Sequence, residues 1–335
     1  MRIFRSCVSF FRKRVRLVPL LATSVITLTI GLGRTAIAAT PDSHWSRAIP
    51  IDSRIVASNQ VTYAVACSNS TFCAAVNGNG DANLLRDGKW SSSVPLNAGG
   101  SLSTVSCPTR TRCVALADGG KAVLFNGHTW TGLGSVGPEA SYSISCVGNA
   151  FCAAVGANGV AGKPSTVATF NGEKWSSRQV KTTGRTNDRL MSVSCASAIF
   201  CMAVNLDGHN LTFNGDSWKS SKKVGPKGLI AVSCASRSFC LAVTLAGIEA
   251  IYNGTTWSSS PIPQFENKFA YTVSCASTVE CTVVGLTGAA ISWSAGTWSK
   301  PVTVFPGGSV SGVNIACSSN QSCVAVDNRG ESVTY

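Results

Sequence analysis

The sequence predicts an all-β protein made of seven copies of one four-stranded unit, and three observations predict it. Fourteen cysteines fall into seven pairs with the same C-x5-C spacing, the first cysteines of successive pairs lie 39 to 49 residues apart, and most units contain a turn followed by a tryptophan. A unit of about 42 residues with four strands, repeated around a ring, is a β-propeller blade. We therefore expect a seven-bladed β-propeller with four antiparallel strands per blade.

The cysteine pairs mark the first two strands of each unit. A β-branched or aromatic run leads into the first cysteine, five turn-like residues follow, and a second apolar run begins at the second cysteine. The pairs are Cys67 with Cys73, Cys107 with Cys113, Cys146 with Cys152, Cys195 with Cys201, Cys234 with Cys240, Cys275 with Cys281, and Cys317 with Cys323. Zinc sites favour shorter spacings and histidine, whereas exported proteins meet an oxidising compartment. We therefore expect seven disulfides, each stapling one hairpin, and no metal or other cofactor.

The second half of each unit supplies the third and fourth strands. A glycine-containing turn such as residues 206–209 comes first, and a third short run then ends in Asn-Gly, two residues before a tryptophan that begins the fourth strand. This pattern starts at Asn126, Asn171, Asn214 and Asn253, and shorter variants end at Trp90 and Trp298. Asn and Gly both tolerate positive φ, so Asn-Gly predicts two-residue hairpins. We expect the recurring tryptophans to pack between blades; the alternative interpretation is that they are platforms for carbohydrate.

The two ends of the chain predict how the ring closes. The seventh unit stops at Tyr335 after its third strand, whereas residues 44–51 near the N-terminus resemble a spare fourth strand with Trp45 near its start. We expect this N-terminal strand to complete the last blade, because closure removes exposed sheet edges. The propeller then occupies residues 39–335 as a single domain.

The first 38 residues are predicted to be a signal peptide. A basic stretch from Arg2 to Arg16 precedes the uncharged run from Leu17 to Gly33, and Ala36-Ile37-Ala38 has the small-x-small pattern of a cleavage site. We expect cleavage after Ala38 and an extracellular or cell-surface location; an uncleaved segment would anchor the chain in a membrane. The rest of the chain carries 21 basic and 15 acidic residues. That mild excess does not indicate a nucleic-acid partner.

The units differ most on one face of the expected ring. The loops between second and third strands and the connections between blades share that face, where propeller ligands usually bind. The connection before the fourth cysteine pair is the longest, and it and the next connection are rich in basic residues. Candidate residues for binding an anionic glycan or polymer are Arg178, Lys181, Arg185, Arg189, Lys222 and Lys223. A solvated surface without a ligand is the alternative interpretation.

The repeat resembles secreted bacterial seven-bladed β-propellers with one disulfide per blade. It reads Val273-Ser274-Cys275, then Cys281, with Asn-Gly-x-x-Trp in most units. More loosely it is similar to sialidase-like and kelch-like propellers and to propeller lectins, although residues 127–130 match only the tail of the sialidase Asp-box. The likeness covers residues 44–335 and implies the fold rather than an activity.

The residues favour binding over catalysis. The chain has only 3 histidines and 15 carboxylates, and we find no paired-carboxylate set, so we name no catalytic residue. We expect a monomeric binding or scaffold propeller whose partner is a glycan, a cell-envelope polymer or an extracellular protein. The alternatives are a sialidase-like glycoside hydrolase or lyase, and a structural spacer without a small ligand.

Overall fold

A computed structural model describes residues 45–52, 63–137, 141–157, 163–181, 189–220, 225–306, 312–319 and 322–335. These residues belong to one compact unit, Pro41–Tyr335, and the predicted signal peptide, residues 1–38, lies outside them. The described residues form strands and turns, and none of them belongs to a helix that would be long and apolar enough to span a bilayer.

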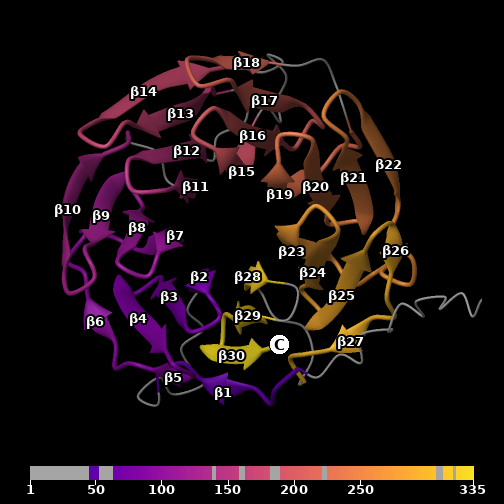
Figure 1. Ribbon diagram of the computed structural model, residues 1–335, viewed down its shortest axis with the longest axis horizontal. Coiled ribbons are helices and arrows are strands. Elements are labelled where there is room, and N and C mark those ends of the chain that lie inside the picture. Colours follow the sequence, from indigo (N-terminus) through magenta and orange to yellow (C-terminus); the bar gives the residue numbers. More distant parts are fainter. Residues whose placement is uncertain are drawn as a thin grey trace, which may run out of the picture. The chain divides into compact units, whose positions relative to one another are not determined.

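Seven antiparallel sheets stand around a central axis, which confirms the predicted seven-bladed β-propeller (Figure 1). We name the four strands of a blade A to D from the axis outward. Strand A is β2 (Tyr63–Asn69), β7 (Leu102–Thr109), β11 (Ser141–Val147), β15 (Leu190–Ser197), β19 (Leu229–Ser236), β23 (Ala270–Ser277) and β28 (Val313–Ser319) in blades 1 to 7. Strand B is β3 (Phe72–Asn77), β8 (Arg112–Ala117), β12 (Phe151–Ala157), β16 (Phe200–Asn205), β20 (Phe239–Thr244), β24 (Glu280–Gly285) and β29 (Ser322–Asp327).

The two outer strands complete each sheet. Strand C is β4 (Asp81–Arg86), β9 (Lys121–Phe125), β13 (Ser165–Phe170), β17 (Asn210–Phe213), β21 (Ile248–Tyr252), β25 (Ala289–Ser294) and β30 (Glu331–Thr334). Strand D is β10 (Trp130–Ser135), β14 (Trp175–Val180), β18 (Trp218–Ser220) and β22 (Trp257–Pro261) in blades 2 to 5. Blade 1 splits strand D into β5 (Lys89–Trp90) and β6 (Val94–Pro95), and blade 6 splits it into β26 (Thr297–Trp298) and β27 (Val302–Thr303).

The ring closes through the N-terminal strand, as predicted. Strand D of blade 7 is β1 (Ile49–Pro50), and it pairs antiparallel with β30. Trp45 packs on Tyr335, with ring centroids 5.4 Å apart, and Trp90 of blade 1 donates from Nε1 to Ser332 of blade 7 at 2.9 Å. Both ends of the described chain are therefore held in one blade.

The hydrophobic core lies between blades rather than inside them. Seven clusters of buried side chains each combine residues of two neighbouring sheets. Strand B is enclosed on both faces, and every residue of β3, β16 and β20 is buried. This double burial explains why the runs after the second cysteines are continuously apolar instead of alternating.

The tryptophans pack as the repeat predicts. Four of them face the aromatic residue opposite them on strand C, with ring centroids 5.3–5.4 Å apart. The pairs are Phe125–Trp130, Phe170–Trp175, Phe213–Trp218 and Tyr252–Trp257. Each also contacts an inter-blade cluster, so these side chains close the outer end of the core.

Serine hydroxyls join the inner strands of neighbouring blades. Strand A is an edge strand, so some of its N–H groups find no partner in its own sheet. In five blades the serine before the first cysteine accepts the N–H of the equivalent cysteine in the next blade, at 2.9–3.0 Å. These serines are Ser106, Ser145, Ser194, Ser233 and Ser274. The Ser-Cys dipeptide therefore links strands within a blade and blades to one another.

The Asn-Gly turns differ from the two-residue hairpins that the sequence predicts. Phe125 pairs with Trp130, so four residues connect strands C and D of blade 2. The Asn126 side chain accepts two N–H groups of its own loop at 2.9 and 3.0 Å, and only Gly127 has a positive φ, 99°. The same capped loop recurs at Asn171, Asn214 and Asn253. The side-chain oxygen of asparagine competes for the turn's N–H groups and fixes the longer loop.

The predicted two-residue hairpins occur in blades 1 and 6 instead. Asp87-Gly88 has φ values of 48° and 79°, and Ala295-Gly296 has 46° and 96°. The flanking residues pair directly across each turn. In both blades three residues then separate the two pieces of strand D, although Ser91 and Ser299 still donate to strand C at 2.8 Å.

Candidate binding site

All seven predicted disulfides are present. Each joins strands A and B of one blade, with S–S distances of 2.05–2.07 Å and Cα atoms 3.9–4.1 Å apart. In blade order the bonds join Cys67 with Cys73, Cys107 with Cys113, Cys146 with Cys152, Cys195 with Cys201, Cys234 with Cys240, Cys275 with Cys281, and Cys317 with Cys323. The fourteen cysteines of the described chain are therefore structural. Among the described residues, no cluster of three or more His, Cys, Asp and Glu side chains could hold a metal ion.

Rigid turns support one face of the ring. We call this the upper face: it carries the turns between strands B and C and the connections between blades, and the lower face carries the other turns. In six blades the outgoing connection donates an N–H to the carbonyl of the glycine that ends the B–C turn. Val136 donates to Gly120 and Ile262 to Gly247, each at 2.8 Å. The turn and the connection are therefore fixed to each other.

The acidic and amide groups at the base of these turns are structural. Asn77 and Asn205 each accept two N–H groups of their own turn at 2.8–3.1 Å. Asp327 does the same in blade 7 and also accepts from Arg329 Nε at 2.7 Å, while Arg329 contacts Glu331 at 2.9 Å. These caps leave the residues at the tips of the turns as the variable part of the face.

The residue that begins each B–C turn differs in polarity between two groups of blades on the upper face. Blades 4, 5 and 6 carry a leucine directly after strand B, namely Leu206, Leu245 and Leu286. The equivalent residues in blades 1, 2 and 7 are Gly78, Asp118 and Asn328. Leu245 is 42% exposed. Burial raises the pKa of the Asp118 carboxyl above its ordinary value.

Bulges on the inner strands place further apolar residues at the upper face of blades 4 to 6. The register of strands A and B shifts by one residue near the upper end of β7, β15, β19 and β23. The bulged residue is Ser103 in blade 2 but Met191, Ile230 and Tyr271 in blades 4, 5 and 6. Such a bulge takes its residue out of the ladder and re-aims the side chain. The side chain of Tyr271 is 39% exposed.

The connection into blade 6 holds a further aromatic residue in solvent. Phe265 is fully buried and anchors this connection, whereas Phe269 is 49% exposed and has a φ of 52°. Its carbonyl accepts the N–H of Leu286 at 3.0 Å, which places it beside the leucine tip of blade 6. A Cβ at Gly285 would overlap the carbonyl of Lys268, so the glycine permits this close approach.

These residues form one surface, which we call the apolar sector. It consists of Leu245, Phe269 and Tyr271, which are exposed, and of Met191, Leu206, Ile230 and Leu286, which are half-buried. A backbone hydrogen bond joins its parts in blades 4 and 5, because the Leu206 carbonyl accepts the N–H of Gly228 at 2.7 Å. The three blades are neighbours in the ring (Figure 1). Contiguous exposed apolar surface of this kind marks interaction sites.

Polar atoms without partners lie at the blade 4 end of the sector. Among the buried atoms of the described residues, Arg189 Nε, Asp207 Oδ2 and His209 Nδ1 make no hydrogen bond. The Arg189 carbonyl accepts the N–H of Leu206 at 3.3 Å, so this group borders the apolar surface. Buried polar groups are ordinarily satisfied, which makes these atoms candidates for contact with a ligand.

The predicted basic site is described only in part. Arg178 lies on the outer strand β14 and donates to the Trp218 carbonyl of the next blade at 3.0 Å, and Lys181 follows that strand. Arg189 precedes the inner strand β15, so three strand spacings, roughly 14 Å, separate the two radial positions. Arg185, Lys222 and Lys223 lie outside the described residues. Of the three candidates that the structure describes, Arg189 borders the apolar sector.

The apolar sector was missed by sequence reasoning, although the sequence contains its signal. The signal is the difference between equivalent repeat positions: leucine in blades 4 to 6 against glycine, aspartate and asparagine elsewhere. The predicted site was based on the clustered lysines and arginines instead. The bulges at Met191, Ile230 and Tyr271 cannot be predicted from the hydrophobic pattern.

Comparisons with known proteins show the fold. No protein-family model and no curated protein matches the chain. Solved propellers do match: YCF48 bound to D1 peptide is 14% identical with a TM-score of 0.65, covering 87% of this chain and 94% of that chain. The WD40 β-propeller domain of Doa1 is 12% identical with a TM-score of 0.66, covering 88% and 97%.

An enzyme shares the architecture as well. A catalytically inactive virginiamycin B lyase from Staphylococcus aureus with quinupristin is 10% identical with a TM-score of 0.67, covering 87% of this chain and 98% of that chain. Binding proteins and an enzyme therefore have the same fold. The activity of this chain has to be argued from its own surface.

Proposed function

We propose that this chain is a binding propeller that holds a segment of a partner protein on the apolar sector of its upper face. The observation that carries the proposal is the grouping of exposed and half-buried apolar side chains in blades 4 to 6, where the leucines after strand B stand against glycine, aspartate and asparagine in blades 1, 2 and 7. Blades 1, 2 and 7 form their sheets without leucine at this position, so the fold does not require the asymmetry. The asymmetry therefore belongs to a ligand that covers three blades.

Charge indicates the chemistry of that segment. Arg189, Lys227 and Lys268 lie on the upper face of the same blades, with Glu266 and Asp207 as the acidic residues among them. An amphipathic segment with apolar side chains and acidic groups complements this surface. A propeller of similar architecture binds a peptide, as its description "YCF48 bound to D1 peptide" states, which supports a peptide ligand in general terms.

The proposed setting is outside the cell. Seven disulfides are consistent with an oxidising environment. The pattern of residues 1–38 favours export through a cleaved signal peptide, with residues 39–335 as the propeller. We propose a secreted or surface-attached monomer.

Peptide selection followed by a two-face comparison tests the proposal. Peptides selected from a random displayed library on the wild-type protein are titrated against two double variants, Leu245→Asp with Phe269→Asp and Ile199→Asp with Val279→Asp. The first pair alters the apolar sector; the second alters residues of the lower face that are 61% and 48% exposed. We expect at least about tenfold weaker binding for the upper-face variant, because a buried aspartate loses apolar contact and its hydration.

The lower-face variant should bind the peptide like wild type. Equal affinity of the two variants would contradict the proposal, as would a library that yields no specific peptide. Circular dichroism of both variants establishes that the blades remain folded.

An anionic glycan or envelope polymer is the second candidate ligand, favoured by the unpaired Arg189 Nε. Binding of such polymers to immobilised protein at low and high salt tests it, with the triple variant Arg178→Ala, Lys181→Ala and Arg189→Ala as the comparison. Salt-sensitive binding that the variant loses would support the glycan. For a sialidase-like hydrolase we see no support in the described chain, where Arg329 and turn N–H groups occupy the buried Asp327 carboxylate.

A further inference from the structure

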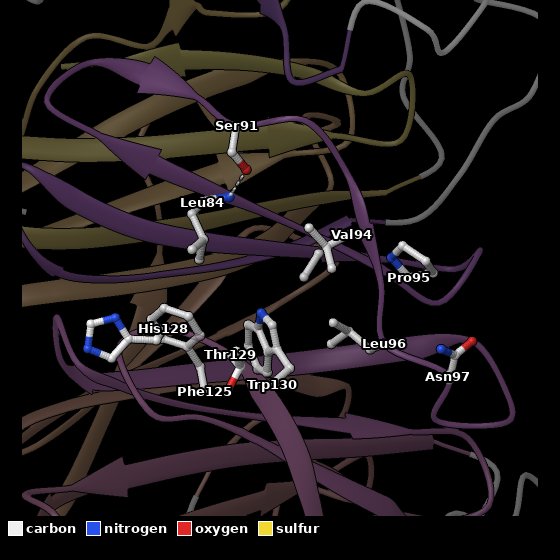
Figure 2. A pocket seen from close by; sticks show the side chains of 11 residues that line it. Leu84, Ser91, Val94, Pro95, Leu96, Asn97, Phe125, His128, Thr129 and Trp130 are labelled. Atoms are coloured by element: carbon white, nitrogen blue, oxygen red, sulfur yellow. Dashed lines mark hydrogen bonds between the residues drawn. The ribbon is translucent and has the colours of Figure 1, made fainter.

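A separate pocket opens at the outer rim of the ring, between blades 1 and 2. It has a volume of about 330 Å³. Figure 2 shows Leu84 and Val94 of blade 1 on one side and Phe125, His128 and Trp130 of blade 2 on the other. The pocket exists because blade 1 has a divided outer strand, whose two pieces cover little of the neighbouring blade. It lies on different blades from the apolar sector.

The indole of Trp130 has a free hydrogen-bond donor at this pocket. In two other interfaces the equivalent tryptophan donates from Nε1 to strand C of the preceding blade: Trp90 to Ser332 and Trp298 to Glu249, each at 2.9 Å. Each acceptor lies on strand C of the preceding blade. It stands three residues before the residue that faces the tryptophan of that same preceding blade. In blade 1 that position is Ala82, which lines the pocket and offers no acceptor. No hydrogen bond of the described residues involves Trp130 Nε1.

The lining of the pocket matches an uncharged amphipathic ligand. No Lys, Arg, Asp or Glu is among the described residues that form it. The floor and walls are aromatic and aliphatic, while polar groups stand at the edge: the exposed Asn97 amide and the exposed His128 imidazole. A pyranose ring has an apolar C–H face and a rim of hydroxyls, which suits an aromatic ring with hydrogen-bonding groups around it.

We propose that this pocket is a binding site for one neutral pyranose ring, which accepts a hydrogen bond from Trp130 Nε1 and packs its C–H face on the apolar lining of the pocket. The site adds a second ligand class to the propeller and is independent of the partner segment proposed for the upper face. The free indole donor is what sets this interface apart from those where the tryptophan is satisfied by a serine or a glutamate.

Nuclear magnetic resonance of the tryptophan indole groups tests the site. The full chain, labelled with ¹⁵N-tryptophan, is titrated with methyl glucoside, methyl galactoside, methyl mannoside and N-acetylglucosamine, and Trp130→Phe assigns the Trp130 signal. We expect a saturable shift of that signal with at least one sugar. Ala82→Ser supplies the acceptor found at the blade 7 interface and should weaken binding about five- to tenfold, the effect of one hydrogen bond.

A matched control is available at the next interface. Ala122 occupies the position of Ala82 in blade 2, where it faces Trp175, whose Nε1 is buried and unpartnered. Ala122→Ser should leave sugar binding at the wild-type level. The proposal is overturned if no sugar shifts the Trp130 signal, if Ala82→Ser binds as tightly as wild type, or if a proline hexapeptide produces the shift that the sugars do not.

Discussion

Single glycines decide whether the upper face can form. The last glycine of each described B–C turn has a positive φ, which an L side chain adopts only at a cost of about 1–2 kcal/mol. At Gly120 a second constraint applies, since a Cβ would overlap the carbonyl of Gly137 in the outgoing connection. The conformation and the close approach together explain why a glycine ends the turn in blade after blade.

Two adjacent glycines separate these effects. Gly119 and Gly120 have φ values of 80° and 79°, but a Cβ at Gly119 would meet nothing within 4 Å. We expect Gly119→Ala to lower the free energy of unfolding by about 1 kcal/mol, from the backbone term alone. Gly120→Ala should lower it by more than about 3 kcal/mol, because the connection must also move. Denaturant unfolding measures both changes. Equal losses would mean that the contact with Gly137 does not contribute to the free energy of unfolding.

Hydrogen bonds between elements hold the blades in register. Each inner strand has an edge that its own sheet leaves unpaired, and the serines before the cysteines pair part of that edge with the next blade. The disulfide fixes the cysteine at the other end of this bond, as Cys240 fixes Cys234 in blade 5. Covalent bonds within blades and hydrogen bonds between blades therefore meet at the same residues.

Removing one hydroxyl tests this connection between elements. Ser194 Oγ accepts the Cys234 N–H at 2.9 Å, so Ser194→Ala leaves that N–H unsatisfied. We expect the free energy of unfolding to fall by about 1–2 kcal/mol. Ser177→Ala, on the exposed face of β14, serves as the control and should change it by less than about 0.5 kcal/mol. Thermal and denaturant unfolding report both, and a loss as large for Ser177→Ala would contradict the role of the hydroxyl.

Closure of the ring is a property of the whole molecule. The seventh sheet takes three strands from one end of the chain and the fourth from the other end. Ile51 is 2% exposed and belongs to the cluster between blades 7 and 1, so the closing segment also completes the core. An open ring would expose the edge of β30 and the apolar face beside it, both of which favour aggregation.

Two truncations measure the contribution of closure. A chain that begins at residue 53 loses β1, Trp45 and Ile51, whereas one that begins at residue 45 keeps them. We expect the shorter chain to lose at least about 3 kcal/mol of unfolding free energy and about 5–10 °C in Tm, and to scatter more light on heating. The longer one should match the full chain. A shorter chain of unchanged Tm would show that the ring does not need its closing strand.

The sequence by itself determined the repeat and everything that follows from its period. Fourteen cysteines at fixed spacing predicted seven blades and seven disulfides, and a spare tryptophan-bearing strand predicted the closure. These features are local or repeated, so they can be read from spacing alone. The packing of the tryptophans could be predicted in the same way, because each tryptophan occupies the same position in its unit.

Only the tertiary structure decided the conformation of the loops and which side chains are exposed. The Asn-Gly loops are four residues long because a side-chain oxygen caps them, and Tyr271 is exposed because its strand contains a bulge. The apolar sector and the pocket at Trp130 arise where blades meet, from residues far apart in the sequence. Contact between distant segments sets these surfaces; comparing the repeats shows which residues differ between blades, but not which of them solvent reaches.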